Sequence, residues 1–493
     1  MLCYRLNRKS QNGRGKVALF SEHFQLNKSQ FELDFVDVLV DGDLPLFIDP
    51  FAISQRIDRW SQECHRTLVA YFERVVHAIK DGELLVAREL LLHLREPNET
   101  RLGLSRDKPQ GAGIGRYQSE QLYNALKLSA AVKTGFLNFL EESELLIEGI
   151  SFDKISDLTT NVIRGHLAEY TKQQCNLFGI PTYQVSIGSY YSFQAGDWLG
   201  DYFDLPVIEE KPVLLVPKMI ARYTPSYVHP KYYNHFVLKY LQEEHLNAGS
   251  NLVRTLKNQN RVVYKKDLKA IFPCTKEFLY SFSKNHPEVM QQYREFLEKM
   301  EKKGKPCIVE PEDEPLVADA LITMLSSINS GSDGASEYHN FMIGLVEFIF
   351  FPNLIYPQKE REIHQGRKRI DIVMENGAND GVFNRLHQIR KLPCAFVAFE
   401  CKNYTTEIAN PELDQIAGRF SPNRGLFGIL CCRQFQDRQK FIERCRDTFK
   451  DSRGLIVPLD DHIITKWLHF IKEKKREFLD EEMSRLIDEV WLD

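Results

Sequence analysis

Two charged residues at the end of an apolar run have the types and the spacing to do chemistry. Residues 395–399 read Ala-Phe-Val-Ala-Phe, which is typical of a buried strand, and Glu400 and Lys402 follow with one residue between them. Side chains alternate faces along a strand, so Glu400 and Lys402 point the same way. Because burying a charge without a partner is costly, this carboxylate and ammonium at the end of a core strand indicate a site.

A third charged residue, Asp371, lies upstream among apolar neighbours. Residues 369–373 read Arg-Ile-Asp-Ile-Val and predict a short strand that could lie beside the first and bring Asp371 to Glu400 and Lys402. Two carboxylates can hold a hard divalent cation through oxygen and leave positions for water and phosphate. The cation lowers the pKa of its bound water, and a lysine can position that water or stabilise developing negative charge. The three residues therefore suit phosphodiester hydrolysis.

These residues resemble the PD-(D/E)XK nuclease superfamily, whose fold is that of restriction endonucleases. Asp371 matches the first acid of its motif, and Glu400-Cys-Lys402 matches the E-x-K element, over about the last third of the chain. The resemblance implies Asp371, Glu400 and Lys402 as catalytic residues and the two acids as ligands of Mg²⁺ or Mn²⁺. It also implies DNA as the substrate and a 5′-phosphate on the product.

The E-x-K spacing alone is not specific, since it recurs at Glu209–Lys211, Glu301–Lys303 and Glu473–Lys475. The last two lie in polar helical patterns, and a solvated helix face explains them. The first separates two apolar runs and predicts a hairpin turn. A structural ion pair is the alternative reading of Glu400 and Lys402.

The resemblance adds further candidates from two helices. Many relatives take a metal-binding acid from the first helix of the domain, and Glu337 resembles it, with Glu347 as the alternative. Gln415 resembles the glutamine that Mrr-like members place beside the metal site, and it joins the predicted catalytic set. Their motif continues Q-x-x-x-Y, whereas this chain has Arg419, whose planar fork suits contact with a phosphate.

Basic residues gather on the predicted strand pair and on an insertion after it. Such residues could track a phosphate backbone and position nucleic acid without reading its sequence. For each of them, a charged and solvated hairpin edge is the alternative. The predicted nucleic-acid contacts are Arg361, Arg367, Lys368, Arg369, Arg390 and Arg419.

Element patterns predict an α/β protein in three parts. Residues 1–228 form a mixed α/β region in which 31–40 and 46–48 predict a hairpin-like pair of strands. Residues 229–329 predict a charged, helical connection. Residues 330–493 predict an α/β domain with a mixed sheet flanked by helices and closed by one long terminal helix, and the resemblance implies that it is a nuclease domain with a restriction-endonuclease-like core. The elements predicted there are a helix over 336–350, strands over 353–363, 368–373, 395–402, 426–432 and 454–458, and helices over 411–420 and 437–450.

A polar stretch in the N-terminal region could also bind something. Asp153, Asp157 and Asn161 are spaced to share one face of a helix that begins near Ser151. That face could bind a metal, a nucleotide or a partner protein. Ordinary helix capping by Ser151 or Asp153, with acids favoured in the first turn, is the alternative.

Composition excludes several classes of protein. The net charge of −4 argues against a globally basic nucleic-acid binder, so any such contact must come from local patches. No apolar run approaches the ~20 residues needed to span a bilayer, and the N-terminus lacks the apolar core of a signal peptide. The ten cysteines form no C-x-x-C pair, so neither a zinc site nor a disulfide framework is indicated. We therefore expect a cytoplasmic protein with no membrane partner.

Together these patterns and the resemblance imply a divalent-metal-dependent endonuclease that hydrolyses DNA, and we expect it to form a homo-oligomer. A large unfamiliar region fused to a lone nuclease domain also resembles bacterial restriction and phage-defence effectors, with the N-terminal region as regulator. Two alternatives stay open: an RNase that uses the same residues, and a non-catalytic nucleic-acid-binding or assembly protein with a nuclease-like fold.

Overall fold

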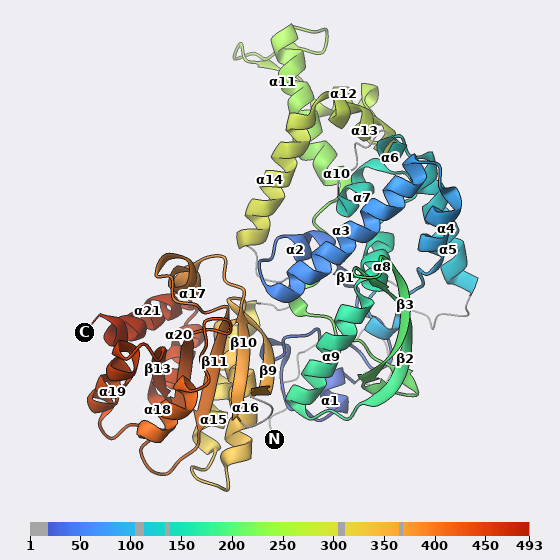
Figure 1. The fold of residues 1–493 in the computed structure, drawn as a ribbon. Helices are drawn as coiled ribbons and strands as arrows, with labels where there is room; N and C mark the ends of the chain where they lie inside the picture. Colours follow the sequence, from blue (N-terminus) through green and yellow to red (C-terminus); the bar gives the residue numbers. More distant parts are fainter. Residues whose placement is uncertain (1–17, 104–112, 134–138, 304–310, 364–367, 493) are drawn as a thin grey trace, which may run out of the picture.

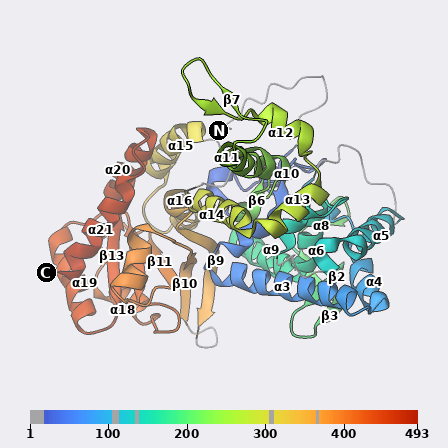
Figure 2. The ribbon, with the colours of Figure 1, turned by 90° about the horizontal axis from the view of Figure 1, so that it is seen from above.

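The structure is a computed structural model that describes residues 18–103, 113–133, 139–303, 311–363 and 368–492 (Figure 1). It is a mixed α/β protein in which helices predominate. Within the described residues, one five-stranded sheet lies in the C-terminal part, and the other sheets are two-stranded. Seen from above, the C-terminal sheet with its helices lies beside a larger, mainly helical body (Figure 2).

The five-stranded sheet has the order β13-β12-β11-β10-β9. Strands β9, β10 and β11, the first three of this sheet in chain order, form an antiparallel meander. Strands β11, β12 and β13 run parallel to one another. Parallel neighbours need crossover connections, and α18 and α19 provide them. The predicted strands and helices of this region are confirmed as β9 Leu354–Ile363, β10 Lys368–Asn376, β11 Phe396–Lys402, α18 Asn410–Ala417, β12 Phe427–Cys432, α19 Arg438–Lys450 and β13 Leu455–Asp460.

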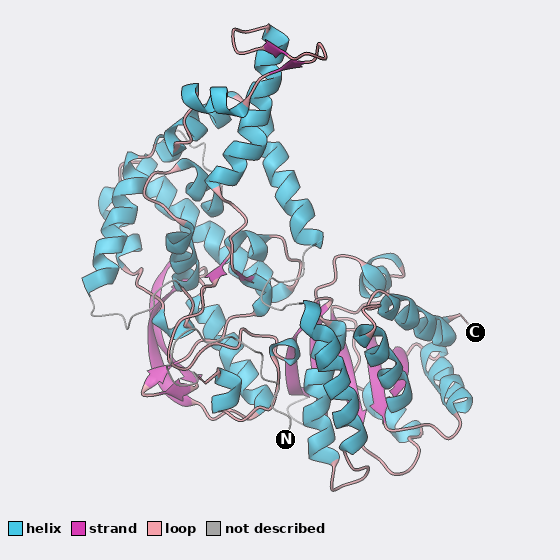
Figure 3. Cartoon of the chain, turned by 180° about the vertical axis from the view of Figure 1, so that it is seen from behind, coloured by secondary structure: helices cyan, strands magenta, loops and turns pink. Residues whose placement is uncertain are grey.

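Helices cover both faces of this sheet, and in the view from behind they lie over its strands (Figure 3). On one face, Phe350 of α16 (Ala335–Phe350) packs against Phe399 of β11, with ring centroids 5.6 Å apart, and against Trp467 of α20 (Asp461–Lys472) at 6.0 Å. On the other face, Gly428 of β12 lies so close to Ile416 and Phe420 that a Cβ there would stand 2.8 Å from either side chain. The expected single terminal helix is wrong, because α20 and α21 (Phe478–Trp491) are separate, with Lys474 at a φ of +60° between them.

The N-terminal body is built on long helices and a twisted ribbon of two strands. Its helices bury a common hydrophobic core that is drawn from residues between Phe20 and Leu297 and also includes Ile355 and Tyr356 of β9. The main elements are α2 Pro50–Ser54, α3 Arg59–Lys80, α4 Leu84–Leu92, α5 Gly113–Leu128, α7 Ser143–Leu146, α8 Phe152–Val162, α9 Arg164–Phe178, β2 Tyr183–Ser192 and β3 Asp197–Leu205.

The predicted connecting region divides between the two cores. Its first helices share the N-terminal core, whereas Val317, Leu321 and Leu325 of α15 (Glu314–Ser327) pack in the C-terminal core. Two short strands, which sequence patterns did not predict, form a hairpin within it. The elements are α10 His229–Tyr232, α11 Leu238–Ala248, β7 Arg254–Thr255, β8 Arg261–Val262, α12 Lys265–Ile271, α13 Lys276–Asn285 and α14 Pro287–Lys303.

The predicted strand pair within residues 31–48 is wrong. Phe47 and Ile48 do form β1, but β1 pairs with β6 (Ala221–Arg222), and Phe35 bridges to Pro217. Residues 33–38 are buried, and the carboxylate of Asp37 accepts hydrogen bonds from the backbone N–H and hydroxyl of Ser21 at 2.9 and 2.6 Å. The apparent alternation thus reflects a buried, irregular segment and not a half-exposed strand.

The hairpin turn predicted at Glu209–Lys211 is confirmed. Strands β4 (Val207–Ile208) and β5 (Lys211–Pro212) pair antiparallel, with two residues between them. Those residues, Glu209 and Glu210, have φ values of +50° and +62°, which is the conformation that a two-residue hairpin turn demands.

Candidate active site

Glu400 and Lys402 lie at the end of β11, the central strand of the five-stranded sheet. They share the face of β11 that carries Ala398, which packs with Val373 of β10 and with Phe420 after α18. The carboxylate of Glu400 is fully buried, and Lys402 Nζ lies 2.6 Å from its Oε1 atom. A buried carboxylate and its ammonium partner therefore stand where the apolar part of the strand ends.

Two residues from the crossover after β11 complete this arrangement. Arg419 contacts Glu400 Oε2 through Nη1 and is itself almost completely buried, at 5% exposure. Gln415, on α18, accepts a hydrogen bond of 3.1 Å from Lys402 Nζ. Four predicted site residues from two separate stretches thus form one chain of contacts: Arg419 and Lys402 pair with Glu400, and Gln415 bonds to Lys402.

Asp371 belongs to the neighbouring strand β10. Its side chain lies outside the described residues, but the backbone register places the residue. Ile372 pairs with Phe399 in the antiparallel register, so the next position along, Asp371, lies opposite Glu400. The two residues are consequently adjacent positions on neighbouring strands, the placement that the sequence predicted for the two acids.

Glu337 lies in the exposed first turn of α16. Hydrogen bonds of Asn403 connect the loop before this helix to the end of β11, and we call this set of bonds the Asn403 clasp. Asn403, which follows Lys402, donates from Nδ2 to the carbonyls of Asn329 and Gly331, both at 2.8 Å. Gly331 N–H donates back to the Asn403 carbonyl at 2.7 Å. The loop before α16 is thereby fixed to the strand that carries Glu400.

Arg433 also contacts Asn403 and the loop before α16. Its Nη1 donates to Asn403 Oδ1 at 3.0 Å and to the carbonyl of Ile328 at 2.9 Å, while its Nε lies 2.7 Å from Asp461. Burial raises the pKa of Asp461 to about 6, although Arg433 acts in the opposite direction. Sequence reasoning missed Asn403 and Arg433, and the only signal was a polar residue directly after the E-x-K element.

Glu347, the alternative to Glu337, lies elsewhere. Its fully buried carboxylate pairs with Lys218 of the N-terminal body, with Nζ 2.8 Å from Oε1. Lys218 Nζ also donates to the carbonyl of Leu33 at 2.6 Å. Nearby, Asp34 accepts a hydrogen bond of 2.7 Å from Tyr170 and one of 3.3 Å from the backbone of Tyr356. Glu347 is thus part of a buried polar contact between the two bodies.

The structure describes the side chains of only some of the predicted nucleic-acid contacts. Arg361, Lys368 and Arg369 occupy β9 and β10, with Arg369 opposite Glu362, but their side chains, and Arg367 entirely, lie outside the described residues. Arg390 is not directed at the site, since its Nη2 lies 2.6 Å from Asp488 of α21 and its guanidinium stacks over Trp491. Its charge is balanced by the terminal helix.

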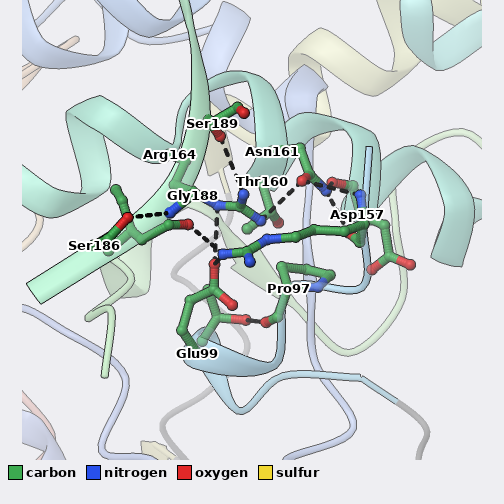
Figure 4. Close-up of polar contacts among 12 residues, drawn as sticks. Pro97, Glu99, Asp157, Thr160, Asn161, Arg164, Ser186, Gly188 and Ser189 are labelled. Atoms are coloured by element: carbon green, nitrogen blue, oxygen red, sulfur yellow. Dashed lines mark hydrogen bonds and ion pairs between the residues drawn. The ribbon is translucent and has the colours of Figure 1, made fainter. Parts of the chain in front are cut away.

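One residue of the polar face predicted on α8, Asn161, takes part in a structural contact with Arg164 (Figure 4). Arg164 is fully buried; it donates to Asn161 Oδ1 at 2.8 Å and to the Ser189 carbonyl at 3.1 Å, and it pairs with Glu99 at 2.9 Å. These bonds fasten the β2–β3 ribbon to the helices. Ser151 caps α8 as predicted, accepting from the backbone N–H of Lys154 at 3.5 Å.

In the part of the chain that the structure describes, no group of three or more His, Cys, Asp or Glu side chains could hold a metal ion. The side chain of Asp371 lies outside that part. Over the described residues, every helix is too short or too polar to cross a membrane.

Comparison with known proteins bears on the N-terminal region alone. Residues 25–228 match the family model described as a domain of unknown function, DUF8370. No curated protein and no solved structure gives a significant match to the chain. The matched segment ends before α10 and includes Lys218, the partner of Glu347, but no residue of the candidate active site.

Proposed function

We propose that the C-terminal domain is a divalent-metal-dependent nuclease that hydrolyses phosphodiester bonds in DNA. The proposal depends chiefly on one observation: Lys402 and Arg419 contact the buried carboxylate of Glu400, Gln415 contacts Lys402, and the strand position of Asp371 lies beside them. The order of helix, antiparallel meander, helix and parallel strand also matches the order expected of a restriction-endonuclease-like core. That finer assignment of the fold is part of the proposal.

The donor set suits Mg²⁺ or Mn²⁺, which Asp371 and Glu400 would hold, with Glu337 as a third ligand. Carboxylate oxygens are the ligands that these hard cations prefer. Glu400 contacts two cationic groups through its two oxygens, Lys402 and Arg419, and a bound cation would share or replace those contacts. When bound, the cation supplies a water of lowered pKa and neutralises charge on the phosphate.

The remaining residues act on the water, the phosphate and each other. Lys402 is held between Glu400 and Gln415, so its ammonium is preorganised to orient the attacking water and to stabilise negative charge on the phosphate. Gln415 positions Lys402. Arg419 balances the charge of Glu400, and its planar fork suits a phosphate oxygen next to the scissile bond.

The decisive experiment compares cleavage of plasmid, linear duplex DNA and RNA by the full chain with Mg²⁺ or Mn²⁺. Glu400→Gln and Lys402→Ala should each lower the cleavage rate of DNA by at least about 100-fold, because the first removes a ligand of the metal ion and the second removes the cation that acts on the water and the phosphate. The matched control is Glu473→Gln, since Glu473 and Lys475 form an exposed ion pair of 2.7 Å with the same spacing. The control should cleave like the wild type.

Binding of Mn²⁺, followed by calorimetry, provides a readout that does not require turnover. Glu400→Gln should abolish or strongly weaken it, whereas Glu473→Gln should leave it unchanged. The assignment would be contradicted if the wild type and the three variants cleave equally, or if Glu400→Gln binds Mn²⁺ as tightly as the wild type. If the wild type cleaves RNA and not DNA, and Glu400→Gln and Lys402→Ala both lose that activity, the site assignment holds and the substrate is RNA.

We also propose that the N-terminal body regulates the nuclease. The support is the buried pair of Lys218 and Glu347, which joins the segment that matches the DUF8370 model to α16, the helix whose first turn carries Glu337. If Lys218 moves away from Glu347, α16 must move with it or leave the Glu347 carboxylate buried without its partner, which is costly.

A further inference from the structure

A basic hairpin projects from the N-terminal body. Strands β7 and β8 pair through Arg254 with Val262 and through Thr255 with Arg261, and residues 254–261 are all exposed. In Figure 1 the hairpin lies beyond the end of α11, at the extremity of the molecule away from the five-stranded sheet.

The shared property of these side chains is positive charge. Residues 254–269 hold six Lys or Arg residues and one acid, a net charge of +5, while the whole chain carries −4 and the rest of it therefore −9. Counting α11 with its acids Glu243 and Glu244, residues 238–269 still carry +4. The cations are Arg254, Lys257, Arg261, Lys265, Lys266 and Lys269.

The base of the hairpin is fixed, so its charges are presented in a defined arrangement. Val263 is buried in the N-terminal core, and its carbonyl accepts from Gln242 at 2.5 Å. Lys265 donates to the carbonyl of Asn234 at 2.6 Å. Exposed Tyr264 lies beneath two cations, with Arg254 and Lys266 at 5.5 and 5.7 Å from the ring centroid.

The tip carries amide side chains. Leu256 N–H donates to the Asn260 carbonyl at 2.9 Å and closes a turn over Asn258 and Gln259, in which Gln259 has a φ of +63°. A two-stranded ribbon is one of the elements that the major groove of DNA admits, and Asn and Gln amides match the edge of adenine there. Lysine and arginine on the flanks suit the phosphates on either side.

We propose that the β7–β8 hairpin is a docking surface for duplex DNA, with Lys257, Lys266 and Lys269 on the phosphate backbone. The inference deepens the proposed function and rests on it for the choice of DNA over other polyanions. It assigns to the hairpin the binding of substrate away from the candidate active site. Loss of the hairpin contacts therefore weakens binding and leaves Glu400 and Lys402 undisturbed.

The test measures binding of the full chain to a labelled duplex of about 30 base pairs by fluorescence anisotropy. EDTA is present throughout, so that no cleavage occurs, and the salt concentration is varied. The variant Lys257→Ala/Lys266→Ala/Lys269→Ala should bind at least about tenfold more weakly, with a logarithmic salt dependence shallower by about 2–3, because each phosphate contact contributes about 0.9. The matched control, Lys80→Ala/Lys440→Ala/Lys474→Ala, removes the same charge from exposed lysines elsewhere and should bind like the wild type.

Several outcomes would overturn the proposal. Equal weakening in both triple variants would mean that overall charge and not the hairpin matters, and unchanged binding by the hairpin variant would exclude the surface. The partner would be wrong if the wild type binds no duplex DNA, or prefers duplex RNA or phosphatidylserine vesicles. Failure of the nuclease proposal looks different, since it appears as intact DNA after incubation of the wild type with Mg²⁺, whatever the binding result.

Discussion

At the scale of single residues, burial perturbs several carboxyl groups outside the candidate site. Asp157 of α8 is the clearest case in the DUF8370 segment. Burial raises its pKa to about 8 from 3.8, and the charges of Asp153 and Glu96 act in the same direction. In the folded protein Asp157 is therefore protonated up to about that pH, while in the unfolded chain it ionises near 3.8. Folding must accordingly include uptake of a proton at this residue across that range.

Asp157→Asn should stabilise the protein, because an amide has the shape of the protonated acid and needs no proton. The gain in melting temperature should be absent near pH 3.8, grow as the pH rises, and level off above pH 8. We expect a gain in the free energy of unfolding of about 5 kcal/mol at the plateau, because the pKa rises from 3.8 to about 8 and one pKa unit corresponds to about 1.36 kcal/mol. Thermal unfolding across pH measures it, with exposed Asp447→Asn as the control. A gain that does not change with pH would contradict the assignment.

At the scale of elements, α16 serves both bodies of the molecule. Its first turn carries Glu337 at the clasp of Asn403, and its last turns carry Glu347 to Lys218. Burial raises the pKa of Glu347, with Asp34 adding to the effect and Lys218 opposing it. The pair therefore balances a desolvation cost with a Coulombic attraction, and each partner depends on the other.

Lys218→Met should destabilise the protein by about 3–5 kcal/mol, since it leaves Glu347 buried next to Asp34 without its cation. Lys218→Met/Glu347→Leu should recover most of that loss, because the double variant buries neither charge. Denaturant unfolding of the wild type, both single variants and the double variant gives the coupling free energy. If the two single effects simply add, the pair does not act as a unit, and the proposed route from the N-terminal body to α16 fails.

At the scale of the whole molecule, the shifted carboxyl groups determine the pH dependence of stability. Burial raises the pKa of Glu141 to about 8, of Asp157 to about 8 and of Glu375 to about 7. The folded state thus binds more protons than the unfolded chain above the ordinary carboxyl range. Stability therefore falls as pH rises toward 8. Burial lowers the pKa of His65 and His166, which opposes this trend only up to about their ordinary value of 6.5.

The melting temperature of the full chain should accordingly decline between about pH 6.5 and pH 8 and then change little. Calorimetric scans in buffers of matched ionic strength measure the decline. Asp157→Asn should flatten part of it. A melting temperature that rises over this interval would show that the buried carboxyl groups ionise without cost.

The sequence by itself determined the local chemistry of the C-terminal domain. An apolar run that ends in Glu400 and Lys402 is a buried strand with a charged end in any compact fold, since strand alternation and the cost of unpaired charge act locally. The turn at Glu209 and Glu210 is local for the same reason. Arg419 was predicted beside a phosphate, and its ion pair with Glu400 needed the path of α18 to be known.

Only the tertiary structure decided contacts between distant parts of the chain. Alternation over residues 31–48 predicted strands, but neighbours near residue 217 and β6 near residue 221 set the backbone pairing there. Glu347 could not be separated from Glu337 by sequence, because its cation is Lys218, which lies in another body of the molecule. The clasp of Asn403 and Arg433 likewise joins loops brought together by the sheet. Local patterns encode what a residue favours, whereas burial by distant segments decides which of those preferences the folded protein can satisfy.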